Sequence, residues 1–498
     1  MRLFSTEQVT KYHPDKLCDQ ISDAILDACL AQDPDSHVAC ECMAKGETII
    51  LAGEITTTAK VDYAGVASRV CAKLGYKASN VLTYIEQQSP EIASGVGDGD
   101  EQGAGDQGMI YGYATSETRS KLPFGFDLAN RITARLEEAT AENNPILKGD
   151  AKVQVTVDLD AEPNITSVKK VLISACHKDS VDFDLIKSYL ETLVWSVIDE
   201  DAVNEVGLKW PRKNIEVITN PAGPWTLGGP SADCGLTGRK IVCDQYGGYC
   251  PVGGGAFSGK NPSKVDRSGA YMARKIACDM VEEYKLKWCE GQIAYAIGQA
   301  APMSVCIKCD QDINLGGVVA AKYDLTPAGI IKALDLKRPI YEKLSGGCHY
   351  REEKIMTAKQ YLKQGYRLKE LIQTHRDELA QLRSMLGSVQ GVSYDKIGGG
   401  STKWNGDTAE YNLVIKCIDL EAQIQQEMNS MVALMQEIHN TIERVHNNDE
   451  RLVLRCKYIL FLSWEKTAQR MNYSDTQVRR LHGSALLSVV VPEKYADK

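Results

Sequence analysis

The 498-residue sequence lacks any run of about 18 consecutive apolar residues, the length that a membrane-spanning helix requires. Its first residues, MRLFSTEQVTKYHPDK, lack the apolar core of a secretory signal. It also lacks an excess of basic side chains, because the formal net charge is −9. This acidity argues against a chain that coats nucleic acid along its whole length, although it leaves room for a local basic patch. We therefore expect a cytoplasmic protein.

Disulfide frameworks and covalent catalytic relays are absent as well. The 16 cysteines have no framework spacing, which is typical of reduced cysteines in the cytosol. Cys306–Cys309 is a single CxxC without the second pair that a zinc site needs. The sequence shows no recognisable Ser-His-Asp or Cys-His pattern, so the chemistry does not require a covalent nucleophile. The 43% hydrophobic and 25% charged residues form an ordinary globular balance, and the length suggests about three domains.

The sequence changes character near residue 352. Before it, strand-like alternation mixes with short amphipathic helices, and Val153, Val155 and Val157 share one face of a predicted strand at 152–159. After it, the pattern predicts long helices at 357–386 and 408–446, then three short helices at 449–491. Apolar residues of the second long helix alternate steps of four and three, as in a coiled coil. They are Ile424, Met428, Met431, Met435, Ile438, Ile442 and Val445.

These patterns predict three parts, at 1–352, 356–448 and 449–490. Charge divides at the same place, because residues 351–498 hold 21 basic and 19 acidic side chains, so the acidic surplus lies in the first part. Residues 451–498 are locally basic, with 9 basic side chains against 4 acidic ones. We expect an α+β fold of mixed sheets and helices in the first part, followed by an all-α appendage.

Four stretches of the first part gather polar side chains around glycines or turns. HPDK (13–16) precedes a helix and offers basic groups for phosphate and a carboxylate for a cation. EQGAGDQG (101–108) carries Asp106 between glycines that let the backbone approach a ligand closely. GGPSADCGLTGRK (228–240) carries Asp233, Arg239 and Lys240, a clamp for phosphate. Each stretch alone is equally consistent with a solvated turn.

The fourth stretch, GGGAFSGKNPSKVDR (253–267), resembles a P-loop without being one. A P-loop needs Ser or Thr after its lysine and an apolar strand before its first glycine. Here Asn261 follows Lys260, and the preceding run CDQYGGYCPV contains glycines. Lys260, Lys264 and Arg267 bring three cations, and Asp266 brings a carboxylate for Mg²⁺. Together the four stretches predict a polyphosphate site that works by aligning substrates and stabilising a leaving group.

The motifs identify a family. HPDKLCDQISDAILDACL, GEITT, QQSPEI, EQGAGDQGMIYGYAT, GGPSADCGLTGRKI and GGGAFSGKNPSKVDRSGAYMAR occur in order over residues 3–350 and resemble S-adenosylmethionine synthetase (methionine adenosyltransferase). The resemblance implies that family's three-domain fold. It also implies its reaction, in which the sulfur of methionine attacks ATP and the released triphosphate is cleaved to pyrophosphate and phosphate.

The resemblance also implies roles for single residues. Catalytic roles fall to His13, Lys152, Arg239, Lys240, Lys260 and Lys264. ATP would meet these residues except Lys152, together with Asp106, Asp150, Trp225 and Asp233. Methionine would meet Glu54, Gln88, Asp233 and Lys264. Two Mg²⁺ ions per site would bind at Asp15 and Asp266, and K⁺ at Glu41. Because the family builds each site between two subunits, a homodimer or a dimer of dimers is implied.

The sequence departs from the family pattern in several places. Lys11-Tyr12 replaces the Glu-Gly that usually precedes His-Pro-Asp-Lys. Trp225 replaces the phenylalanine that stacks on adenine, and Pro224 precedes it. The segment between Gln88 and Glu101 is shorter than in bacterial members, and the family's last segment is missing after 347–353. Since every charged position maps, we interpret the chain as a divergent but functional copy.

The appendage has its own pattern. Residues 463–471 predict a helix, 472–474 a turn and 475–487 a second helix capped by Ser474 or Asp475. This is the spacing of a helix-turn-helix, although a plain helical hairpin fits equally well. The region 356–490 resembles phage-type transcriptional regulators with a sigma-factor region-four-like helix-turn-helix. DNA would then meet Gln477, Arg479, Arg480 and His482. The alternative function is therefore a DNA-binding regulator that carries a weakly active or inactive synthetase.

Overall fold

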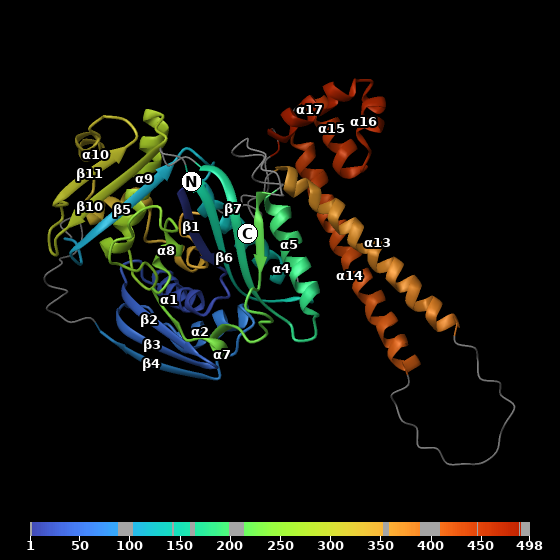
Figure 1. Cartoon of the computed structure of the whole chain (residues 1–498), viewed down its shortest axis with the longest axis horizontal. Helices are drawn as coiled ribbons and strands as arrows, with labels where there is room; N and C mark the ends of the chain where they lie inside the picture. The colour runs from blue at the N-terminus through green and yellow to red at the C-terminus, as the bar shows by residue number, and fades with distance from the viewer. Residues whose placement is uncertain are drawn as a thin grey trace, which may run out of the picture. The chain divides into compact units, whose positions relative to one another are not determined.

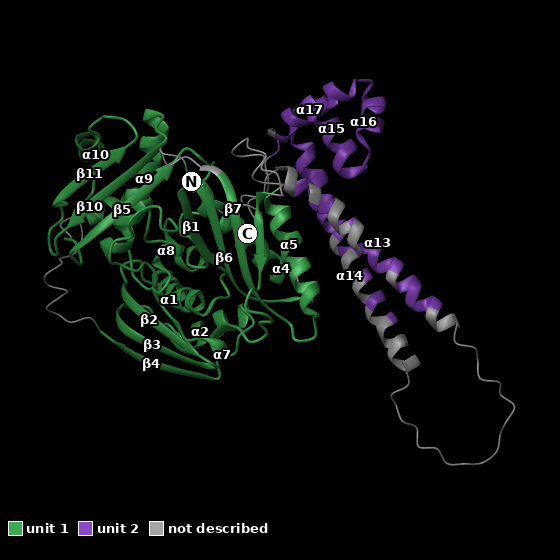
Figure 2. Ribbon diagram, in the orientation of Figure 1, with its two compact units in different colours: residues 1–351 green, residues 352–498 purple. Residues whose placement is uncertain are grey.

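The structure is a computed structural model that describes residues 2–87, 103–141, 144–159, 165–198, 214–351, 358–388, 409–445, 447–487 and 489. The chain divides into two compact units, residues 1–351 and residues 352–498 (Figure 2). Each unit is described by itself. Among the described residues, no helix combines the length and the apolar character that crossing a membrane requires. The first unit has a mixed α/β architecture of three sheets, and the second is largely helical.

The first sheet has the strand order β1-β6-β7-β8. Its strands are β1 (Arg2–Val9), β6 (Leu147–Leu159), β7 (Ile165–His177) and β8 (Glu216–Thr219). Helices α4 (Phe124–Ala141) and α5 (Phe183–Val197) cover one face (Figure 1). The predicted strand at 152–159 is confirmed, because Val153, Val155 and Val157 are all buried in the core beneath these helices.

The second sheet has the order β4-β3-β2-β9, with β3 and β4 parallel. Its strands are β2 (His37–Lys45), β3 (Thr48–Thr56), β4 (Asn80–Glu86) and β9 (Gly235–Leu236). Helices α1 (Pro14–Leu30) and α2 (Tyr63–Lys73) cover one face. The opposite face exposes large apolar side chains. They are Met43, Leu82, Tyr84 and Leu236.

The third sheet has the order β11-β10-β5, and α9 (Val265–Tyr284) packs against it. Its strands are β5 (Gly108–Thr115), β10 (Trp288–Tyr295) and β11 (Ser304–Cys309). Gly112 lets the helix approach the sheet, because a Cβ there would lie 2.1 Å from the carbonyl oxygen of Ala273. The remaining helices among the described residues of this unit are α7 (Gly229–Ala232), α8 (Ile241–Asp244), α10 (Gly316–Lys322), α11 (Pro327–Leu334) and α12 (Tyr341–Leu344).

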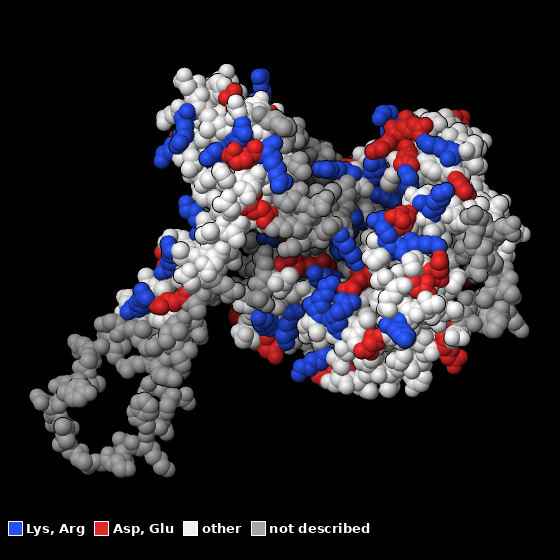
Figure 3. Space-filling view, turned by 180° about the vertical axis from the view of Figure 1, so that it is seen from behind, with Lys and Arg blue, Asp and Glu red and all other residues white. Residues whose placement is uncertain are grey.

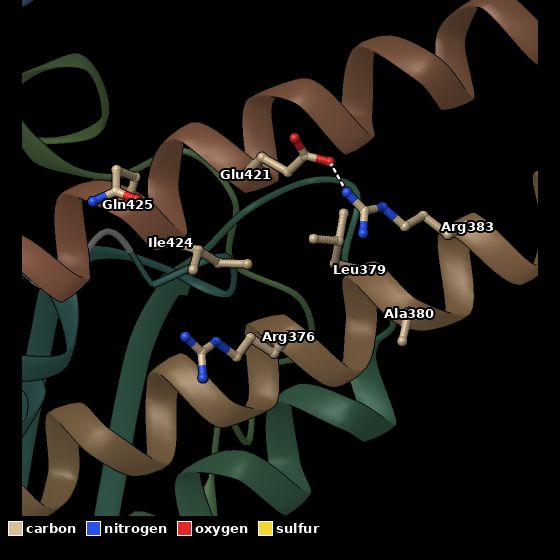
Figure 4. A pocket seen from close by; sticks show the side chains of 7 residues that line it. All are labelled: Arg376, Leu379, Ala380, Arg383, Glu421, Ile424 and Gln425. Carbon is tan, nitrogen blue, oxygen red and sulfur yellow. Dashed lines mark hydrogen bonds and ion pairs between the residues drawn. The ribbon is translucent and has the colours of Figure 1, made fainter.

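The second unit begins with two long helices, α13 (Ala358–Ser388) and α14 (Ala409–Glu443), as the sequence predicts. They run antiparallel, since Tyr361 near the start of α13 bonds Thr441 near the end of α14. At the other end, Arg383 pairs with Glu421 across the hairpin at 2.5 Å (Figure 4). The predicted seam lies in the interface: Ile424, Ile438, Ile442 and Val445 are buried, and the three methionines Met428, Met431 and Met435 are partly buried.

Shorter helices complete the second unit. They are α15 (Asn448–Leu454), the π-helix η4 (Arg455–Ile459), α16 (Trp464–Met471) and α17 (Asp475–Leu487). Their buried residues share one core with the base of the hairpin, in which Tyr361 and Ile438 contact the same cluster as Val453 and Val478. The hairpin and the terminal helices therefore form one packed body.

Candidate active site

A turn that precedes α1 presents His13. The Nδ1 atom of His13 accepts the N–H of Asp15 at 3.1 Å and so caps the helix, which leaves the ring proton on Nε2. Burial, followed by the cations of Lys240 and Lys152, lowers the pKa of His13 to about 3. His13 is thus a neutral hydrogen-bond donor rather than a cation in the ligand-free protein.

Asp15 holds two cations at the same turn. Its side chain is 1% exposed; Oδ2 lies 2.5 Å from Nζ of Lys240, and Oδ1 lies 3.6 Å from Nη1 of Arg239. Oδ1 also accepts the N–H of Leu236 at 3.0 Å. Burial raises the pKa of Asp15, but the hydrogen bonds from Lys240 and Leu236 outweigh it, so the pKa lies below its ordinary value. An ionised carboxylate therefore faces a pair of cationic side chains.

Asp150 has a buried carboxyl group, and one of its two oxygens lacks a hydrogen-bond partner among the described residues. Its Oδ2 accepts the N–H of Gly229 at 2.7 Å, whereas its Oδ1 is buried and bonds to none of the described residues. Burial raises the pKa of Asp150 to about 6. The charges of Lys152 and Asp233 act on it, so the three belong to one group with His13. An unsatisfied buried oxygen of this kind is suited to a ligand hydroxyl or amine.

The glycine loop before α9 is anchored by a buried ion pair. Arg267 donates to both oxygens of Asp23, at 2.7 and 2.6 Å, and to the carbonyl oxygen of Lys260 at 3.0 Å. The Oδ1 atom of Asp23 also accepts the N–H of Gly259 at 2.8 Å. Gly259 has φ +80, and a Cβ there would lie 2.0 Å from the carbonyl oxygen of Cys40. Only glycine fits this position, and the loop is fixed against α1 and β2.

The loop presents two lysines beside carboxylates. Nζ of Lys260 lies 2.5 Å from Oδ2 of Asp266 in the first turn of α9. Burial, and then the charge of Lys260, lowers the pKa of Lys264 to about 8. Glu41 on β2 and Glu54 on β3 act on Lys264 in the opposite direction. Burial and the charge of Glu54 raise the pKa of Glu41.

The predicted residues thus form two groups. The turn group comprises His13, Asp15, Asp150, Lys152, Asp233, Arg239 and Lys240. The loop group comprises Glu41, Glu54, Lys260, Lys264 and Asp266. Within the part of the chain that the structure describes, no hydrogen bond or ion pair joins one group to the other. Each group combines cations with carboxylates, as a complex of polyphosphate and divalent cations requires.

Comparison with known proteins accounts for this arrangement. Residues 1–94, 101–225 and 227–359 match the models of the N-terminal, central and C-terminal domains of S-adenosylmethionine synthetase. The S-adenosylmethionine synthase of Brachyspira hyodysenteriae is 42% identical over 376 residues, which cover 70% of this chain and 93% of that protein. S-adenosylmethionine synthase 1 of Rhodospirillum rubrum is 42% identical over 364 residues, with 70% and 93% covered. The chain belongs to the S-adenosylmethionine synthetase family.

Two cations that the motifs suggested for phosphate are in structural ion pairs in this member of the family. Lys16 is fully buried, with Nζ 3.0 Å from Asp19 and 2.6 Å from Asp244. Arg267 is fully buried against Asp23. The HPDK turn and the glycine loop offered Lys16 and Arg267 as candidate cations for phosphate. Both are instead enclosed by carboxylates, Lys16 by Asp19 and Asp244 and Arg267 by Asp23.

Trp225, for which the family resemblance implies stacking on adenine, is held by His177, a residue that the sequence patterns did not single out. Nε2 of His177 accepts the N–H of Trp225 at 3.1 Å, and the N–H of His177 donates to the carbonyl of Trp225 at 2.9 Å. Nε1 of Trp225 donates to the carbonyl of Leu227 at 2.6 Å. His177 ends β7, so only the folded sheet brings it to residue 225. No local sequence motif predicts the contact between His177 and Trp225.

Asp106 and Gln88 complete the set of predicted ligands. Asp106 is exposed in the loop before β5, and its Oδ1 accepts the N–H of Gln107 at 2.7 Å. No hydrogen bond within the described ranges links it to the turn group or the loop group. Gln88 lies outside the described residues.

Beyond the family match, the short helices α16 and α17 follow each other across a turn at residues 472–474. Ser463 caps α16, Asn472 ends it in the left-handed conformation, and α17 follows at Asp475. Ser474 and Gln477 bond to each other's backbone, which forms a capping box at the start of α17. The last of the three synthetase matches ends at residue 359, before α16 and α17 begin.

The surface of α17 differs from the prediction at one position. Gln477, Arg479 and Arg480 are exposed. His482 is buried: its Nε2 lies 2.9 Å from the hydroxyl of Tyr458, whose ring stacks on it. The expectation that His482 meets DNA is wrong, because the helix turns this side chain into the core. On the face shown in Figure 3, the Lys and Arg side chains of the terminal helices are spread out rather than gathered in one patch.

Proposed function

We propose that the chain joins ATP and methionine to S-adenosylmethionine and then cleaves the released triphosphate to pyrophosphate and phosphate in the cytoplasm. In the first step, the sulfur of methionine forms a bond to C5′ of the ribose. The C5′–O bond breaks, and its electron pair leaves with the triphosphate. In the second step, water cleaves the triphosphate. The observation that carries this proposal is the turn group, in which Arg239 and Lys240 flank the buried Asp15 in a synthetase of this family.

The chemistry is suited to side chains that align substrates and neutralise charge. A thioether needs no deprotonation, so the main requirement is in-line geometry and stabilisation of the departing triphosphate. Arg239, Lys240 and Lys152 supply positive charge, and the Nε2–H of His13 supplies a neutral donor. Lys260 and Lys264 supply further charge from the loop group. Since Lys264 has its pKa lowered to about 8, an anionic ligand beside it would favour its protonated form.

The carboxylates fit the cations that the family uses. Asp15 and Asp266 would each hold one Mg²⁺, and Glu41 would hold K⁺. Among the described residues, no three potential ligands form a closed metal site. That fits Mg²⁺, which commonly takes one or two carboxylates and completes its shell with phosphate oxygens and water. Bound Mg²⁺ would neutralise the oxygens of the triphosphate.

The remaining positions would bind the organic parts of the substrates. The free Oδ1 of Asp150 is suited to a ribose hydroxyl or the methionine amine, with Asp106 and Asp233 as further carboxylates. The Trp225 ring would stack on adenine. Glu54 and Gln88 would orient methionine.

A second copy of the chain would complete each site in a homodimer or a dimer of dimers. Two observations support this. Among the described residues, no hydrogen bond or ion pair joins the turn group to the loop group, and the open face of the second sheet exposes Met43, Leu82 and Tyr84. Glu41 and Glu54 lie on the same open face, because they alternate with buried residues on β2 and β3. Pairing of such faces would bury the apolar side chains and bring the two groups together.

Incubation of the full chain with ATP, methionine, Mg²⁺ and K⁺ tests the proposal. S-adenosylmethionine measured by mass spectrometry, with matched pyrophosphate and phosphate, is the expected result. Cleavage of ATP without S-adenosylmethionine would contradict the role given to the methionine ligands. Absence of any turnover would overturn the synthetase assignment and favour the regulator.

DNA binding by the second unit is a separate proposal, which the α16–turn–α17 geometry favours. The exposed Gln477, Arg479 and Arg480 would face the DNA. Arg479 already pairs with Asp475 at 2.7 Å and lies over the Trp464 ring, so Arg480 is the more available of the two cations. Fluorescence anisotropy with labelled duplex DNA tests this. Binding that weakens with salt and with Arg480→Glu is expected, and equal binding by the variant would contradict it.

A further inference from the structure

Tyr12 occupies a position at which the family resemblance predicts glycine. Its ring packs against Gly149. Tyr12 is 6% exposed. Gly149 has φ +101, and a Cβ there would lie 2.6 Å from Cγ of Tyr12 and within 3.0 Å of two further ring atoms. Gly149 therefore permits a contact with the aromatic ring that no other residue would allow. Asp150 is the next residue in the chain, so the Tyr12 ring borders the backbone that carries this carboxyl.

Tyr76 fixes the same place from the other side. Its hydroxyl donates to the carbonyl oxygen of Tyr12 at 2.6 Å. Its ring packs against Gly229, where a Cβ would lie 2.4 Å from a ring carbon. The N–H of Gly229 is the donor that holds Oδ2 of Asp150. Tyr76 thus connects the turn that carries His13 to the donor of Asp150.

Further bonds tie the turn to the strand that carries Asp150. The hydroxyl of Thr10 donates to the carbonyl of Gly149 at 2.8 Å, and it accepts the N–H of Ala151 at 3.1 Å. The N–H of Lys11 donates to Oε1 of Glu137 at 2.6 Å. The turn that carries His13 and the strand position of Asp150 therefore form one hydrogen-bonded assembly.

A cavity of about 450 Å³ lies behind this assembly. Tyr12, Tyr76, Asp150 and Gly228 line it together with residues of α2 and α4. Loss of the Tyr12 ring would extend this cavity toward Gly149 and Asp150. Side chains around a void lose contacts on one side and shift, so the cavity makes Asp150 sensitive to the ring.

We infer that Tyr12 and Tyr76 are positioning residues: they hold His13 and Asp150 at the spacing that ATP requires, Tyr12 by its ring and Tyr76 by its hydroxyl. The inference rests on the proposed synthetase function. It assigns a role to the Lys11-Tyr12 departure, since the larger side chain fills space that glycine would leave open.

Four variants of the full chain test the pair. Tyr12→Gly removes the Tyr12 ring, whereas Tyr12→Phe keeps the ring and removes only its hydroxyl. Tyr76→Phe removes the hydroxyl that donates to the carbonyl oxygen of Tyr12. Tyr189→Phe is the matched control, because it removes a phenol that bonds Asn144 at 2.7 Å in the first unit, outside both groups. The readouts are kcat and KM for ATP and for methionine, the affinity for Mg-ATP by calorimetry, and thermal unfolding.

We expect Tyr12→Gly to lower kcat/KM for ATP about tenfold or more, since small misplacements of positioning groups are costly. Tyr76→Phe should lower it severalfold, Tyr12→Phe should restore most of the loss, and the control should match the wild type. A merely structural pair would lower the melting temperature and the amount of active enzyme while KM and Mg-ATP affinity stayed unchanged, and that result would overturn the inference.

The two proposals fail in different ways. If the wild type makes no S-adenosylmethionine, the synthetase function fails, and the calorimetric comparison still decides whether the tyrosines shape an ATP site. If the wild type makes the product and Tyr76→Phe retains full affinity and KM, the synthetase stands and the positioning role falls. Since Tyr76→Phe removes one oxygen atom, it keeps the test valid should Tyr12→Gly fail to fold.

Discussion

The Lys260 ammonium lies 2.5 Å from the Asp266 carboxylate, so one of the proposed phosphate ligands occupies one of the proposed Mg²⁺ ligands in the free protein. Binding of Mg-ATP would separate the pair, because phosphate oxygens would take the lysine and the metal would take the carboxylate. The loop is therefore charge-neutral at this point before the substrate arrives.

We predict that Lys260→Ala lowers kcat at least a hundredfold and leaves the fold intact, because it removes a charge that stabilises the leaving triphosphate. Steady-state kinetics and circular dichroism check this. Lys275→Ala is the control, since it removes an exposed partner of Asp279 on the same helix. Unfolding of Lys260→Ala would show that Lys260 is structural instead.

The buried Asp23–Arg267 pair should matter for stability. We predict that Asp23→Asn lowers the free energy of unfolding by about 3–5 kcal/mol, because it leaves a buried guanidinium without its counter-charge. It should also loosen the loop through the N–H of Gly259. Urea unfolding measures the change. Asp35→Asn at the exposed pair with Lys337 should change stability by less than about 1 kcal/mol, and equal effects at both sites would contradict the prediction.

Asp150 should make stability depend on pH. Its pKa of about 6 lies above the ordinary 3.8, so the folded form holds the proton more tightly than the unfolded form. The stability gained from this proton is complete below pH 3.8 and is lost as pH rises through 6. We therefore predict that Asp150→Asn raises the melting temperature of the ligand-free protein at pH 8 but not at pH 3.5. An equal shift at both values would contradict this.

The contact between His177 and Trp225 should set the affinity for adenine. We predict that Trp225→Ala raises KM for ATP severalfold, in line with about 0.5–1.5 kcal/mol for an aromatic stack. His177→Ala should produce part of this effect because it releases the backbone of Trp225. A bound nucleotide should quench tryptophan fluorescence in the wild type and less in Trp225→Ala. Unchanged KM for ATP in both variants would mean that adenine binds elsewhere.

In the second unit, His482 and Arg480 should behave oppositely. His482→Ala should unfold this unit at a lower temperature, because the ring is buried and lies 2.9 Å from the hydroxyl of Tyr458. Arg480→Ala should leave its melting temperature unchanged, because the side chain is exposed. Calorimetry of the full chain measures both, and a loss of stability in Arg480→Ala alone would reverse the assignment.

Local signals sufficed for several elements. The strand at 152–159 and the helices at 463–471 and 475–487 were predictable because alternation and capping residues act within a few positions. The proximity of the two lysines and the carboxylate of the glycine loop was predictable for the same reason, since they lie within seven residues of sequence.

Long-range partners were not predictable in this way. Lys16 reads as a phosphate ligand until the fold brings Asp244 to 2.6 Å, and Arg267 reads as one until Asp23 encloses it. His482 looked exposed because helical spacing alone does not say which face packs on Tyr458. In each case the deciding neighbour belongs to another element, so only the folded chain determines which charges remain free.

The pairing of the first strand bears on how the chain is made. Residues Arg2 to Val9 pair with residues Leu159 to Lys152, so the β1 strand lacks this partner until about 150 more residues are synthesised. At roughly 5–20 residues per second, that delay is on the order of ten seconds or more. The pairing of β2 with Gly235 and Leu236 of β9 requires a still longer stretch of chain to be synthesised. The nascent first unit thus exposes strand edges throughout most of its translation, a period in which protection by chaperones would decide how much of the protein escapes aggregation.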